Sequence, residues 1–248
     1  MFAGKGWLVG IADIDEAGMR ETAAMLPTGL ASIHRLDVRE RHQWDSALGH
    51  FMAVSGGRLD CLFNNAGIGS GGKWDKLDPQ EADRVIDINF RGVVNGIYAA
   101  RPHLLATPGS AIVNTGSASG YYGSPGMAVY SATKFAVRAL SEALDIEFAP
   151  DGIMVRSVMP GFIDTPLLNR AVPGSNQTSR DRVVAAGLEF TPVEQVAQAV
   201  WDAIHGDRLH IPVGVTARRL AFATRWMPGR LRKRFKKATG NAALLGSR

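Results

Sequence analysis

The chain has 248 residues, of which 46% are hydrophobic and 21% charged, a balance typical of one globular domain with a full core. Its single cysteine, Cys61, excludes an internal disulfide, and the sequence has no apolar run near the roughly 20 residues needed to cross a bilayer. The net charge of +5 is uneven: eleven Lys and Arg and no Asp or Glu lie between Arg208 and Arg248, whereas the first 207 residues hold 17 basic and 23 acidic side chains.

Strand-like and helix-like segments alternate along the chain. Strands are expected at residues 6–12, 31–38, 59–64, 111–115, 154–159 and 209–213, and helices at residues 16–26, 43–54, 78–100, 130–148 and 191–204. Two of these helices begin with sequences that fit a capping box, at Asp78 and at Thr191. The alternation is typical of βαβ units, so we expect an α/β fold: a doubly wound parallel sheet, Rossmann-like, in a single domain.

One long segment, residues 162–190, has no regular pattern and is rich in Pro, Gly, Ser and Asn. In parallel sheets ligands lie beyond the carboxyl ends of the strands, so this segment is a candidate substrate lid. Its apolar side chains favour an apolar substrate of steroid, retinoid or lipid type. These side chains are Phe162, Leu167, Leu168, Val172, Val183, Val184 and Leu188.

A tyrosine and a lysine with helical spacing carry the strongest chemical signal. Tyr130 and Lys134 are four residues apart, so on a helix they share one face, and the ammonium group would favour the ionised phenol. A tyrosine with a lowered pKa is a usable general acid or base. Ser117 follows the strand expected at residues 111–115, where its hydroxyl would meet a substrate oxygen. The three residues together indicate redox chemistry between an alcohol and a carbonyl group.

With these residues in place, the chain resembles the short-chain dehydrogenase/reductase family over residues 7–213. The resemblance rests on the order and spacing of the motifs Asn64-Asn65-Ala66-Gly67, Asn89, Ser117, Tyr130 with Lys134, and Pro160 to Thr165. It implies that Tyr130 exchanges a proton with the substrate oxygen, Ser117 hydrogen-bonds that oxygen, and Lys134 lowers the pKa of the tyrosine and holds the nicotinamide ribose. Asn89 would anchor a water molecule on the proton path. No metal site is expected.

The resemblance also implies a dinucleotide site. Asp13 follows the first strand, where its carboxylate would bind the ribose 2′-hydroxyl and repel a 2′-phosphate; this favours NAD over NADP, with Asp15 the weaker candidate. Further cofactor contacts are implied for Asp37, Val38, Asn64, Ala66, Gly67, Tyr130, Lys134, Pro160, Gly161, Ile163 and Thr165.

One departure from the family pattern concerns the beginning of the chain. The family starts with a strand and a glycine-rich turn that holds the pyrophosphate, and neither occurs here. Two hypotheses follow: the start of the chain has been placed too late, which we favour, or the chain is a truncated form. Without that strand, its two neighbours in the sheet would have exposed edges.

The sequence therefore predicts an NAD(P)-dependent oxidoreductase in residues 1–215, acting on an alcohol or carbonyl compound, with a basic amphipathic tail in residues 216–248. The alternative is a non-catalytic binding or scaffold protein that has the family's shape and cannot hold the dinucleotide. We expect a cytoplasmic homo-oligomer. An anionic membrane surface is one partner that the tail fits, and packing on the domain or a second subunit is the other; no motif for nucleic acid accompanies the charge.

Overall fold

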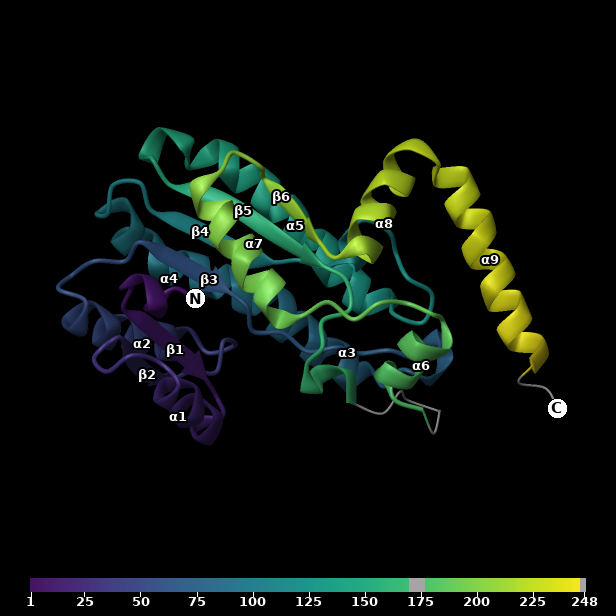
Figure 1. Ribbon diagram of the computed structural model, residues 1–248, viewed down its shortest axis with the longest axis horizontal. Helices are drawn as coiled ribbons and strands as arrows, with labels where there is room; N and C mark the ends of the chain where they lie inside the picture. The colour runs from purple at the N-terminus through teal and green to yellow at the C-terminus, as the bar shows by residue number, and fades with distance from the viewer. Residues whose placement is uncertain (170–176, 246–248) are drawn as a thin grey trace.

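The computed structural model describes residues 1–169 and 177–245 and has a Rossmann-like α/β fold (Figure 1). All of its strand pairs are parallel, and helices cover both faces of the larger sheet. The strands are β1 (Val9–Asp13), β2 (Ala31–Arg35), β3 (Cys61–Asn64), β4 (Ala111–Thr115), β5 (Met154–Pro160) and β6 (His210–Val213). The larger helices are α1 (Glu16–Ala24), α2 (Arg41–Val54), α3 (Pro79–Ile86), α4 (Gly92–Leu105), α5 (Ala128–Glu147), α6 (Ser179–Ala185), α7 (Val193–His205), α8 (Val215–Trp226) and α9 (Pro228–Leu245).

The strands form two sheets rather than one. β1 pairs with β2, and a separate four-stranded sheet has the order β3-β4-β5-β6. Within the described residues β1 and β3 therefore each have an edge without a strand partner, as expected from the sequence. Phe63 on β3 is exposed, which agrees with an open edge at this side of the larger sheet.

The larger sheet is buried on both faces, which explains why β4 and β5 are almost continuously apolar. On one face α2, α4 and α5 pack over Ile112 and Val155 in a cluster with Leu104 and Val137. On the other face α7 packs its Ala199, Val200 and Ala203 against Val113 and Val158. A row of buried polar groups crosses the first layer: Asn64 Nδ2 donates to Asn114 Oδ1 (2.9 Å), and Asn114 Nδ2 donates to Ser141 Oγ (3.0 Å).

The expected helix at residues 78–100 begins as predicted but has a different interior. Asp78 caps α3 by accepting a hydrogen bond from Gln80 N (3.0 Å), with Pro79 at the first helical position. The helix then passes through a π-helical turn, Asp87–Arg91, before continuing as α4 to Leu105. Such π turns are rare and frequently mark functional sites.

The second expected capping box is wrong. Thr191 does not cap α7; its backbone instead pairs with the segment after β5, donating to Phe162 O (2.8 Å) and accepting from Asp164 N (3.1 Å). A true capping box lies in the segment that showed no regular pattern, where Thr178 and Asp181 begin α6. Local sequence could not show that tertiary pairing would recruit Thr191.

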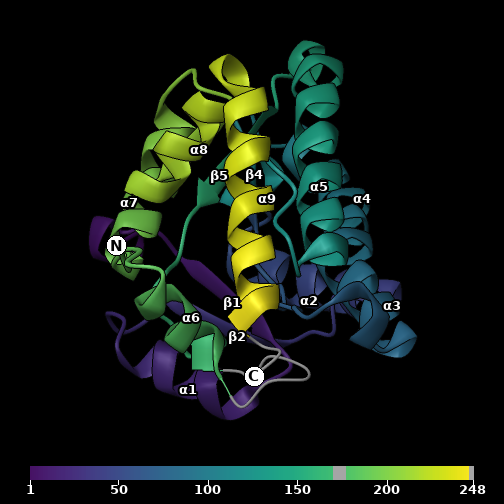
Figure 2. The same ribbon diagram turned by 90° about the vertical axis from the view of Figure 1, so that its right-hand side faces the viewer.

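The basic tail forms two helices at the end of the molecule where the strands terminate. α8 begins two residues after β6, and its Ala217 is fully buried, so this helix packs on the body. α9 then runs along one side of the molecule, the side that faces the viewer in Figure 2. Among the described helices none is long and apolar enough to cross a membrane.

Candidate active site

Ser117, Tyr130 and Lys134 meet beyond the carboxyl end of β4. Ser117 caps a short 3-10 turn, Ala118–Gly120, and its Oγ accepts a hydrogen bond from Ser119 N (3.1 Å). Gly120 lets this turn approach α5 closely, because a Cβ there would lie 2.9 Å from Lys134 O. Tyr130 and Lys134 lie on the first turns of α5, so the strand end and the helix start bring the three side chains together, as the sequence predicts.

Lys134 is buried and points at the end of β4. Only 4% of the residue is exposed, and Nζ donates a hydrogen bond to Thr115 O (2.8 Å). Burial lowers the pKa of Lys134 to about 8, because the charged ammonium group loses its hydration. Nζ lies 5.8 Å from the centre of the Tyr130 ring, over its face.

The expected phenolate at Tyr130 is not favoured in this state of the protein. Burial raises the pKa of Tyr130, and hydrogen bonding with the Ser117 side chain lowers it by less. The helical spacing correctly places Lys134 beside the ring, but spacing alone cannot show how strongly the phenol is desolvated. The hydrogen bond with Ser117 therefore stabilises the ionised form here, by less than burial disfavours it.

Asn89 lies in the π turn and is fully buried. Its Oδ1 accepts from Ile68 N (2.8 Å) and its Nδ2 donates to Ile68 O (2.9 Å), so the amide fixes the loop that follows β3. Gly67 in this loop approaches the site: a Cβ there would lie 3.2 Å from Asn89 Oδ1 and 3.7 Å from Lys134 Nζ. The structure thus joins Asn89, Gly67 and Lys134 in one cluster.

The residues expected on the adenosine side lie at the carboxyl ends of β1 and β2. Asp13 is exposed at the end of β1, and its Oδ1 accepts from Asp15 N (3.1 Å), while Asp15 caps α1. Asp37 pairs with Arg39 in a bidentate contact, which is the main cause of its lowered pKa. Val38 is partly buried, and its carbonyl accepts from Trp44 Nε1 (3.0 Å).

The stretch Asn64 to Gly67 divides between core and surface. Asn64 points into the core toward Asn114, whereas Ala66 and Gly67 are exposed at the open side of β3. Asn65, Ala66 and Gly67 are therefore accessible to a ligand, and the Asn64 side chain is not. The side chain of Asn64 supports the sheet instead.

The residues after β5 surround the same edge of the sheet. Pro160 ends β5, Gly161 N donates to Val213 O (3.0 Å), and Ile163 forms a bridge with Thr191. Thr165 Oγ1 lies 3.5 Å from Ile163 O, at the beginning of the lid segment. Of the expected lid side chains, Leu167, Val184 and Leu188 are exposed, Val183 is buried, Phe162 and Leu168 are partly buried, and Val172 lies outside the described residues.

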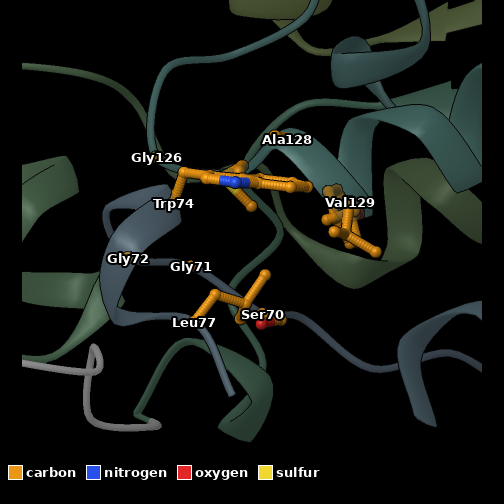
Figure 3. Close-up of a pocket in the computed structure, with 10 residues that line it drawn as sticks. Ser70, Gly71, Gly72, Trp74, Leu77, Gly126, Ala128 and Val129 are labelled. Carbon is orange, nitrogen blue, oxygen red and sulfur yellow. The ribbon is translucent and has the colours of Figure 1, made fainter. Parts of the chain in front are cut away.

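A pocket beside Tyr130 involves residues that the sequence analysis missed. It has a volume of about 70 Å³ and lies between the segment from Ser70 to Leu77 and the beginning of α5. Figure 3 shows the Trp74 ring extending from that segment toward Ala128 and Val129, and Trp74 is 75% exposed. A backbone hydrogen bond from Gly72 N to Gly126 O (2.7 Å) ties the two walls together. The cluster of glycines before Trp74 was the available signal.

Taken together, a phenol, a hydroxyl and a buried ammonium group converge beside a small pocket at the carboxyl edge of a parallel sheet. A substrate oxygen placed between Ser117 and Tyr130 would accept a hydrogen bond and exchange a proton with the phenol. Among the described residues no group of His, Cys, Asp and Glu is arranged to hold a metal ion.

Comparison with known proteins agrees with this geometry. The profile of the family described as "short chain dehydrogenase" matches residues 1–176. Cyclopentanol dehydrogenase of Comamonas testosteroni is 33% identical over 228 residues, covering 88% of this chain and 90% of that protein. Meso-2,3-butanediol dehydrogenase of Serratia marcescens is 32% identical over 225 residues, covering 87% of each. A short chain dehydrogenase/reductase structure from Burkholderia phymatum in complex with NAD has a TM-score of 0.79 at 25% identity, covering 94% of this chain and 88% of that one.

Proposed function

The chain belongs to the short-chain dehydrogenase family of NAD(P)-dependent dehydrogenases and reductases, and from this premise we propose that it interconverts a secondary alcohol and a ketone, or an alcohol and an aldehyde. The observation that carries the proposal is the convergence of Ser117, Tyr130 and buried Lys134 at the end of β4. These are the groups needed to bind and protonate a carbonyl oxygen. Relatives named as dehydrogenases of small alcohols support the reaction class.

Each residue has a distinct role in the proposed reaction. A bound nicotinamide dinucleotide supplies or accepts the hydride. Tyr130 Oη gives its proton to the substrate oxygen during reduction and takes it back during oxidation, and the Ser117 hydroxyl orients that oxygen. Lys134 favours the phenolate by its positive charge. Asn89 holds the loop with Gly67 against Lys134, which keeps the ammonium group in place.

The residues present fit two parts of a dinucleotide. Lys134 and the exposed residues Ala66 and Gly67 would contact the ribose next to the catalytic groups. Glycine at position 67 keeps this space open, because a Cβ there would contact Asn89 and Lys134. Asp13, exposed at the end of β1, supports a preference for NAD because it would repel a 2′-phosphate. The T-G-x-x-x-G-x-G pattern with which the family holds the pyrophosphate does not occur in the 248 residues.

The substrate is proposed to be apolar. Trp74 and Leu77 line the pocket beside Tyr130. In the lid segment, Leu167, Val184 and Leu188 are exposed. Steroid, retinoid and lipid alcohols have the matching chemistry.

The test is turnover of a panel of secondary alcohols, from cyclopentanol to a hydroxysteroid, followed by nicotinamide absorbance with NAD⁺ and with NADP⁺. We expect faster turnover with NAD⁺, and Asp13→Asn should reduce that preference because it removes the charge facing a 2′-phosphate. Absence of any nicotinamide reduction by the folded protein would favour the non-catalytic scaffold. Faster turnover with NADP⁺ would overturn only the cofactor assignment.

A second copy of the chain is the proposed partner for the α4 and α5 face. The two helices lie side by side in Figure 2, and large apolar side chains on them face solvent. These are Tyr98, Leu105, Phe135 and Ile146. Light scattering should show an oligomer that Ile146→Asp dissociates, and a monomeric wild-type protein would refute this assignment.

A further inference from the structure

We propose that the exposed face of α8, together with α9, binds the surface of an anionic phospholipid bilayer. The face is built from three arginines and two aromatic residues of α8: Arg218, Arg219, Phe222, Arg225 and Trp226. At about 100° per residue, all five fall within roughly a third of the helix circumference. This surface lies outside the catalytic site and has no role in the proposed chemistry.

The aromatic side chains of this face are unusually open to solvent. Phe222 is 58% and Trp226 is 65% exposed, and the guanidinium group of Arg225 lies over the Trp226 ring, 5.4 Å from its centre. The opposite face of α8 is the one that packs on the body, through fully buried Ala217. A helix with Trp and Phe flanked by Arg on its free face is the kind that lies in the interface of a bilayer.

The charges of α9 extend the same surface chemistry. Leu231 and Phe235 are the partly buried residues of its described side chains, and Phe235 stacks on Tyr122 with ring centres 5.3 Å apart. The remaining face exposes Arg230, Arg232, Lys233, Arg234, Lys236 and Lys237. Within the described part of the chain, none of the cations of α8 and α9 forms an ion pair with a carboxylate.

The distribution of charge favours an anionic surface over a second copy. An isologous contact would bring the arginines of α8 against the same arginines of the partner, which is repulsive. An anionic bilayer attracts these cations and repels the body, because the first 207 residues hold 17 basic and 23 acidic side chains. The separation of charge would therefore orient the molecule with α8 and α9 toward the lipid.

The contacts of α8 and α9 with the body place this surface beside the turn at Ala118–Gly120, which Ser117 caps. Tyr122, which stacks on Phe235, lies in the loop between the turn at Ala118–Gly120 and α5, and α8 packs on that same turn. A membrane-bound molecule would have its lipid-facing helices next to the turn that Ser117 caps. If the proposed apolar substrate is correct, that substrate could reach the site from the lipid. The bilayer binding itself does not depend on that function.

The first experiment is co-sedimentation of the protein with vesicles of phosphatidylcholine alone and with vesicles containing phosphatidylglycerol. We expect binding to the anionic vesicles that weakens as salt is raised. The triple variant Arg218→Gln, Arg219→Gln, Arg225→Gln should lower the partition coefficient by on the order of 100-fold, at about fivefold for each cation. A matched variant on the body, Arg20→Gln, Arg58→Gln, Arg84→Gln, removes the same charge from exposed sites and should bind nearly as the wild type.

The second experiment tests which face meets the lipid. Brominated acyl chains should quench the fluorescence of Trp226, so Trp226→Phe should lose most of the quenching and Trp74→Phe should retain it. The pair Phe222→Ala, Trp226→Ala should weaken binding about tenfold or more, because each ring loses apolar burial. Since both rings are exposed, circular dichroism should show an unchanged fold.

Several outcomes would overturn the proposal. Equal binding to neutral and anionic vesicles, or equal losses in the α8 and body variants, would show that this face is not the site. Dimers that Phe222→Ala, Trp226→Ala dissociates, without vesicle binding by the wild type, would assign the face to a second copy. Binding of single-stranded RNA but not vesicles, weakened by the same α8 variants, would assign it to nucleic acid.

Discussion

A Lys134→Met substitution is expected to stabilise the fold near neutral pH while removing the proposed chemistry. Lys134 is buried, and burial lowers its pKa from 10.5 to about 8. A shift of this size corresponds to about 3 kcal/mol of unfavourable free energy when the group is charged in both states. Losing the hydrogen bond to Thr115 O opposes the gain by about 1 kcal/mol. The variant should therefore be more stable by about 2 kcal/mol near pH 7.

The pH dependence of this difference is the sharper part of the prediction. In the wild type the unfolded chain binds the Lys134 proton up to its ordinary pKa, whereas the folded protein releases it near pH 8, so wild-type stability is lost as pH falls from about 10.5 toward 8. The stability difference between variant and wild type should thus shrink by about 2 kcal/mol between pH 7 and pH 9.5. Below about pH 8 it should be constant.

The assay is urea unfolding of both proteins at matched ionic strength across this pH range. Lys76→Met is the matched control, because Lys76 is exposed and its removal should leave a difference that does not vary with pH. A Lys134→Met difference that stays constant from pH 7 to pH 9.5 would refute the reasoning that Lys134 is held with a low pKa.

Three further predictions follow from individual contacts. Tyr130→Phe should reduce turnover by about 10²- to 10⁴-fold with NADH affinity unchanged, measured by steady-state kinetics and fluorescence titration; wild-type turnover would remove Tyr130 from the mechanism. Gly96→Ala should lower the free energy of unfolding in urea by about 1–3 kcal/mol, because its Cβ would lie 2.6 Å from Asn64 Oδ1 and 2.7 Å from Trp44 Cη2. Gly49→Ala, with nothing within 4 Å of its Cβ, should raise the free energy of unfolding, and a change of the same sign in both variants would contradict the packing. Burial lowers the pKa of His210 despite its contact with Glu142, so the protein should lose stability as pH falls below about 6.5. His210→Gln should reduce that loss in urea unfolding, and an equal loss of stability in variant and wild type would contradict this assignment.

The sequence predicted the elements that local pattern determines. The apolar run at Ala111–Thr115 is β4 with those bounds, and the i, i+4 spacing of Tyr130 and Lys134 places both on α5 near Ser117, as expected. Tertiary effects were not predictable. The π turn at Asn89 has no local signature, and Thr191 is drawn from its expected cap into pairing with Phe162. The pKa of Tyr130 depends on burial, which spacing does not report.

The pocket beside Tyr130 shows a second limit of prediction from sequence. The cluster of glycines before Trp74 was a local signal, but it could not show that a hydrogen bond between Gly72 and Gly126 would bring this segment against Tyr130. Asn64 was expected beside the cofactor because it belongs to a recognisable motif. Its side chain instead joins Asn114 inside the core, and the residues that follow, Asn65 to Gly67, are the exposed ones.

NADH binding tests the central claim, that this site belongs to a dehydrogenase, most directly. Energy transfer from tryptophan to bound NADH should be titrated on the 248-residue chain and, in parallel, on the product of its full native reading frame. We predict saturable binding that Asp13→Asn and Lys134→Met both weaken. A well-folded protein in which neither form binds NADH would contradict the account and leave a protein that has the family's fold without its chemistry.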